Sequence, residues 1–129
     1  RVDLDALRVK NEEFVAGAQE GRRGVMEIHN GIHRAIYAAS NNPILEKVLT
    51  QLLDQSNRIA YFVPKVGGRR YTSDDIDLRD HESLFEALAS NDPDAATVAF
   101  QAHVKHSEEQ VVEALMQSRY FSELPIRIA

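Results

Sequence analysis

Five histidines are the residues of this sequence best suited to chemistry, because imidazole binds transition metals and exchanges protons near neutral pH. They are His29, His33, His81, His103 and His106. His29 and His33 are four residues apart, so in a helix they would stack on one face. Burying one polar ring without a partner costs roughly 1–3 kcal/mol, and one divalent cation could compensate several rings together.

The elements that would position these rings are predicted to be helices, since apolar residues recur with helical spacing almost everywhere. We expect helices over residues 4–20, 22–39, 43–62, 75–90 and 93–118, with a loop over residues 64–71 and an irregular tail from residue 119. Asn-Asn-Pro at 41–43 and Asn-Asp-Pro at 91–93 separate two of the helix pairs,. The expected fold is all-α, a single antiparallel helical bundle.

Helical spacing places four of the histidines toward the interior of this bundle. His29 falls within the apolar stripe of residues 22–39, and His33 lies at its edge,. His81 falls among the apolar residues of 75–90, and His103 lies on a face of small residues in 93–118. His106 is expected to be peripheral. A single buried histidine is commonly an ordinary core residue bonded to a carbonyl, but four on three helices are harder to explain in that way.

Composition restricts the classes of function. The 129 residues suffice for one domain, and the longest apolar stretches are too short to cross a membrane,. No secretory signal is visible, and the absence of cysteine excludes disulfides and thiolate metal sites, which fits a cytoplasmic protein,. With 15 basic and 20 acidic residues, the net charge is −5, and the basic residues are not clustered. We therefore expect this chain to bind nucleic acid poorly.

Three stretches combine into a more specific pattern. The first is HNGIHRAI at residues 29–36, followed by ASNNPIL at 39–45. The second is DHE at 80–82, leading to EAL at 86–88 and ND at 91–92. The third is DAA at 94–96, leading to His103, which follows His81 by 22 residues. Together they resemble the FCD domain, the C-terminal effector-binding domain of FadR-type regulators in the GntR family.

The resemblance implies a bundle that holds a divalent metal on an Asp or Asn and three histidines, with a small organic acid beside the metal. Carried over to this chain, the three histidines are His33, His81 and His103, and the Asp or Asn position falls on His29. Four imidazoles would favour zinc or nickel over magnesium or calcium and would attract an anionic ligand more strongly. Alternatively, His29 is not a ligand and water takes its place.

The resemblance also implies what is missing. The first helix of the family's domain and the winged-helix DNA-binding domain have no counterpart here, so residues 1–129 would form one effector-binding and dimerisation domain. DNA would be bound only through the absent N-terminal domain, by a homodimer. Among the remaining residues, Arg58 and Tyr61 are candidates to meet an effector carboxylate, with a surface position as the alternative for Arg58,.

Three functions compete at this point. The first is a metal-dependent sensor of a small carboxylate in a transcription regulator, which is not an enzyme. The second is a helical metalloenzyme, which would need a general base near the metal. The sequence contains neither His-Glu-x-x-His nor paired Glu-x-x-His, which argues against that reading,. The third is a structural dimerisation module without a metal.

Overall fold

The computed structural model describes residues 2–67 and 75–116, excluding the side chains of residues 60–67, 75–80 and 114–115. Within these ranges the chain forms helices and contains no strand. The helices are α1 (Leu4–Gln19), α2 (Val25–Ala38), α3 (Pro43–Gly67), α4 (Asp75–Ala89) and α5 (Pro93–Met116). The all-α fold predicted from the sequence is confirmed.

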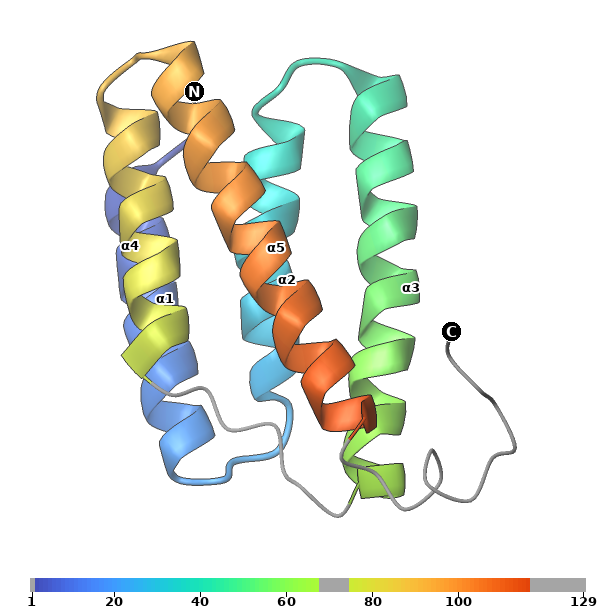
Figure 1. Cartoon of the computed structure of the whole chain (residues 1–129). Coiled ribbons are helices and arrows are strands. Elements are labelled where there is room, and N and C mark those ends of the chain that lie inside the picture. Colours follow the sequence, from blue (N-terminus) through green and yellow to red (C-terminus); the bar gives the residue numbers. More distant parts are fainter. Residues whose placement is uncertain (1, 68–74, 117–129) are drawn as a thin grey trace.

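The five helices of the described chain form a closed ring in which each packs against two neighbours, in the order α1, α2, α3, α5, α4 and back to α1. Figure 1 shows α4 beside α1, and α5 crossing obliquely between α4 and α3. Helices α2 and α5 are not direct neighbours in this ring, and neither are α2 and α4. The side chains that α2, α4 and α5 turn inward therefore meet across the centre of the bundle.

The turns that join α2 to α3 and α4 to α5 are built alike. Asn41 and Asn91 both adopt left-handed backbone conformations, with φ of 52° and 56°. Asparagine tolerates this region better than most residues do and commonly ends a helix there. Pro43 and Pro93 then begin the next helices, where a missing N–H costs nothing,. The carboxylate of Asp92 caps α5 by accepting a 2.9 Å hydrogen bond from a first-turn amide,.

The contact between α1 and α2 depends on two glycines. A Cβ added at Gly17 would lie 2.7 Å from Cγ1 of Val25, so only glycine permits this close approach of the two helices. Gly24 has a φ of 80° and immediately precedes α2. Since a right-handed helix cannot include that conformation, α2 begins at Val25 and not at Arg22, where the sequence predicted its start.

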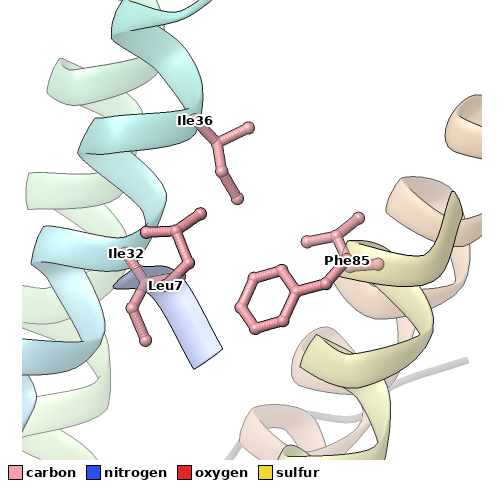
Figure 2. Packing of buried hydrophobic residues seen from close by; sticks show 5 residues of the cluster. Leu7, Ile32, Ile36 and Phe85 are labelled. Carbon is pink, nitrogen blue, oxygen red and sulfur yellow. The ribbon is translucent and has the colours of Figure 1, made fainter. Parts of the chain in front are cut away.

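The apolar core fills one end of the ring. Leu7 from α1, Ile32 and Ile36 from α2, and Leu84 and Phe85 from α4 form a buried cluster. Figure 2 shows Leu7, Ile32 and Ile36 facing the ring of Phe85. Because Phe100 of α5 packs against the same cluster, the core fixes the distance between α2 and the α4–α5 pair. That distance sets the space available to the histidines in the middle of the bundle.

Helix α3 differs most from the sequence-based expectation. It continues through Pro64 to Gly67, although the loop was predicted to begin at residue 64; residues 68–71 of that loop lie outside the described chain. A proline inside a helix removes one backbone hydrogen bond and crowds the carbonyl four residues earlier, at a cost of roughly 3 kcal/mol. Its fixed φ is nevertheless compatible with a helix, and α3 continues for one further turn. Part of the apolar stripe of α3 is also exposed, with Ile44 at 78% and Leu52 at 52%.

Ion pairs connect α2 to α3 and α1 to α4. Arg34 contacts Glu27 on its own helix and Asp54 on α3, each at 3.0 Å. Arg8 of α1 contacts Glu82 of α4 at 2.9 Å, next to one of the histidines. Partly exposed pairs contribute only about 0–1 kcal/mol each, so they orient the helices more than they stabilise them. No helix in the described part of the chain is long and apolar enough to cross a membrane.

Candidate metal centre and adjoining cavity

Four histidines from three helices meet at the centre of the ring. His29 and His33 come from α2, His81 from α4 and His103 from α5. One nitrogen from each ring can be chosen such that all four lie within 4.8 Å of one another. His33, His81 and His103 are buried, whereas His29 is partly buried. The structure therefore brings together all four of the metal ligands that were predicted, and His106 is not part of this group.

The spacing of the two α2 histidines fits a shared cation. The Nε2 atoms of His29 and His33 are 3.3 Å apart. Two nitrogens bound at 2.0–2.1 Å to a tetrahedral zinc ion would be separated by about 3.3 Å. Without a cation, one Nε2–H can donate to the other nitrogen, and the observed distance also permits that bond. The other two histidines add nitrogen donors next to this pair, which favours a shared cation.

His81 has the clearest ligand geometry. Its Nδ1 lies 2.7 Å from Oδ1 of Asn11, and both side chains are almost completely buried. Since an amide oxygen can only accept, Nδ1 carries the proton and Nε2 carries a lone pair. That Nε2 is buried and has no hydrogen-bond partner among the described residues. A buried acceptor left unpaired costs about 1–3 kcal/mol, which a cation at the centre of the cluster would offset.

Asn11 was missed by sequence reasoning. It lies on the same stripe of α1 as Leu7 and Phe14, both of which are buried. A polar residue on an apolar helix face needs a partner, so the pattern contained a signal. The identity of that partner could not be read, because His81 is 70 residues away along the chain.

Burial keeps three of the four rings neutral in the absence of a cation. Desolvation lowers the pKa of His29 to about 4 and that of His81 to about 2, and repulsion from neighbouring imidazolium rings adds to both shifts. The pKa of His33 is lowered by the same two causes. Neutral imidazole is the form that binds metals, so these three rings can act as ligands at neutral pH.

A cavity of about 540 Å³ adjoins the cluster between α2, α3 and α5. Its wall includes His29, His33 and His103, whereas His81 stands behind them on α4. The polar remainder of the described wall comprises Ser56, Asn57, Ser107 and Glu108. The rest of it is aliphatic or aromatic: Phe14, Met26, Tyr37, Leu49, Leu52, Leu53, Ile59, Phe100, Val104, Val111 and Val112. A small molecule in this cavity would touch three of the four imidazoles.

The two residues predicted to bind an effector carboxylate lie on α3. Arg58 is exposed and is not among the described residues that line the cavity. The side chain of Tyr61 lies outside the described residues. Tyr37, which the sequence did not single out, lines the cavity one turn beyond His33, with ring centroids 6.1 Å apart. Burial raises the pKa of Tyr37, so its hydroxyl keeps its proton and can donate to an anion,.

Comparison with known proteins agrees with this architecture. Residues 1–106 match the FCD domain family, and the chain belongs to that family. It is 24% identical over 123 residues to the uncharacterized HTH-type transcriptional regulator YcbG of Bacillus subtilis (strain 168). The match covers 88% of this chain and 49% of the relative, so the chain spans about half the length of that regulator. No solved structure matches the chain. The resemblance to the FCD domain that the histidine motifs indicated is confirmed. This family consists of regulator domains and not of enzymes.

Proposed function

We propose that residues 1–129 are the metal-dependent effector-sensing domain of a transcription regulator, and that the effector is a small carboxylate. The observation that carries this proposal is a cluster of four imidazoles, three of which line a ligand-sized cavity. A core of ordinary histidines would be expected to pair with backbone carbonyls. Here His81 instead leaves a buried nitrogen without a described partner beside three further rings.

His29, His33, His81 and His103 would hold the cation. A donor set made only of nitrogen favours zinc or nickel over magnesium or calcium. Because all four ligands are neutral, the bound cation supplies an uncompensated positive charge that accepts a carboxylate oxygen. His81 would anchor the site from α4, and the other three rings would leave the side facing the cavity accessible to the effector.

The ring of helices supports a route from binding to regulation. Helix α2 does not pack directly against α4 or α5, so a cation bound by ligands from all three helices would connect α2 to the α4–α5 pair. An effector that contacts α2, α3 and α5 at once would favour one spacing of these helices over another,. In a homodimer, that change would reposition DNA-binding domains attached outside this chain. A regulator that acts on bacterial DNA would work in the cytoplasm.

Metal analysis of histidine variants tests the proposal. His81→Ala and His103→Ala should each lower the zinc retained after dialysis well below one ion per chain, measured by mass spectrometry of untagged protein. His106→Ala is the matched control, because it removes a histidine of α5 that does not belong to the cluster. Circular dichroism checks that each variant keeps its helices. Full zinc retention in both cluster variants would contradict the proposed site.

A further inference from the structure

We infer that the effector carries a single carboxylate on an elongated apolar body, such as a medium-chain or aryl-substituted monocarboxylic acid, and not several carboxylates. This inference rests on the proposed function for the carboxylate end. For the body of the effector, it rests on the chemistry of the cavity wall. The length, the polarity and the charge of the cavity each contribute a separate argument.

The cavity is long in one direction. On α2 its wall reaches from Met26, one turn before His29, to Tyr37, one turn after His33. Eleven residues of helix rise about 16 Å, so the cavity extends well beyond the histidine cluster. A molecule as small as a two- or three-carbon acid would touch the imidazoles and leave most of this space unfilled. The dimensions favour a ligand with a body of several carbons.

The wall around that body is apolar. Leu49 and Leu53 of α3 face Phe100 and Val111 of α5 across the space next to α2. Leu52 and Val104 also line it while remaining 52% and 62% exposed, so apolar surface continues to the mouth of the cavity. Each methylene group transferred from water to such a surface contributes up to about fourfold in affinity. A hydrocarbon body therefore matches the cavity better than a hydrophilic one does.

The charges of the wall disfavour a second carboxylate. No lysine or arginine is among the described residues that line the cavity, and the charged residue present there is Glu108. The hydroxyl protons of Ser56 and Ser107 are already donated to backbone carbonyls of their own helices, at 3.0 and 3.1 Å. These hydroxyls therefore act as acceptors, and the neutral donors that remain in the described wall are the Tyr37 hydroxyl, next to His33, and the Asn57 amide,. A second carboxylate would lose its hydration and meet the negative charge of Glu108.

Two acids of equal length test the inference directly. Octanoate and octanedioate have the same number of carbons but carry one and two carboxylates. Their dissociation constants for the zinc-loaded 129-residue chain can be measured by isothermal titration calorimetry. We expect octanoate to bind at least tenfold more tightly than octanedioate. From butanoate through hexanoate to octanoate, affinity should rise about two- to fourfold per methylene.

A charge reversal at the cavity wall tests whether Glu108 disfavours a second carboxylate. Glu108 is exposed, so Glu108→Lys should fold normally and improve octanedioate binding relative to octanoate by at least about threefold,. Glu109→Lys is the matched control, since it changes the net charge equally but lies outside the cavity wall. It should leave the ratio of the two affinities unchanged.

The outcomes separate this inference from the proposed function. Equal or tighter binding of octanedioate, no gain with chain length, or no octanoate binding to zinc-loaded protein would each overturn the inference. If octanoate is preferred and the gain with length is seen, the inference stands. The same titration on zinc-free protein then tests whether octanoate binding depends on the metal. Unchanged octanoate affinity without zinc would reject the role of the metal while leaving the apolar effector in place.

Discussion

Replacing Asn11 by leucine should weaken zinc binding although Asn11 is not itself a proposed ligand. The Asn11 amide oxygen holds the proton of His81 on Nδ1 through a 2.7 Å hydrogen bond, which leaves Nε2 as the donor toward the cluster. Leucine is close to asparagine in size, so the buried site stays filled, but the orientation of the His81 ring and its choice of tautomer are no longer imposed. Loss of such supporting hydrogen bonds typically lowers metal affinity about 10–100-fold. In free energy, this corresponds to about 1.4–2.7 kcal/mol.

Competition with a zinc chelator of known affinity measures this change. The dissociation constant of Asn11→Leu should rise by one to two orders of magnitude, whereas Asn11→Asp should bind zinc at least as tightly as the parent, because a carboxylate accepts the same hydrogen bond more strongly. Asn57→Leu serves as control, since Asn57 lines the cavity and no hydrogen bond joins it to His81. If Asn11→Leu keeps its helices and binds zinc within twofold of the parent, the reasoning from the His81 tautomer is wrong.

Further predictions concern stability and binding. In the metal-free protein, the folded state holds His29 and His81 neutral while the unfolded chain takes up protons near pH 6.5, so the free energy of unfolding should decrease as the pH falls from about 6.5 to 4. The loss is about 1.4 kcal/mol per pH unit for each such histidine, and a flat profile in urea titrations would contradict it. Zinc at 100 times its dissociation constant should add about 2.7 kcal/mol to the free energy of unfolding at neutral pH, a gain that chelator reverses in a thermal melt. Ile32→Ala should cost about 2–5 kcal/mol, because Ile32 is completely buried in the core, whereas Val9→Ala at an exposed site of α1 should cost little,. This chain alone should show no DNA affinity at physiological salt in a mobility-shift assay, given its net charge of −5,.

The residues that would bind the effector could be predicted from the sequence only in part. Sequence reasoning named Arg58 because a guanidinium suits a carboxylate, but residue type alone does not say which face of α3 meets the cavity, and Arg58 is exposed. Tyr37 was passed over because it has no distinctive spacing of its own. Tyr37 becomes a candidate because it lies on α2, one turn from His33, and lines the cavity. Candidate ligand-binding residues outside the histidine motif could be found only once the helices were packed.

The sequence by itself determined the helices and the inward placement of the histidines. Helix periodicity and the Asn-x-Pro turns act within a few residues, so they can be read along the chain, and the same spacing placed His81 and His103 on buried faces. On α2 it placed His29 within the apolar stripe and His33 at its edge, whereas the structure buries His33 more fully than His29. Only the tertiary structure decided that the rings meet at one point, that His81 pairs with Asn11, and that a cavity opens on the α3 side. These features depend on the distances between helices that are remote in sequence. Those distances follow from the packing of the whole ring, which no local pattern records.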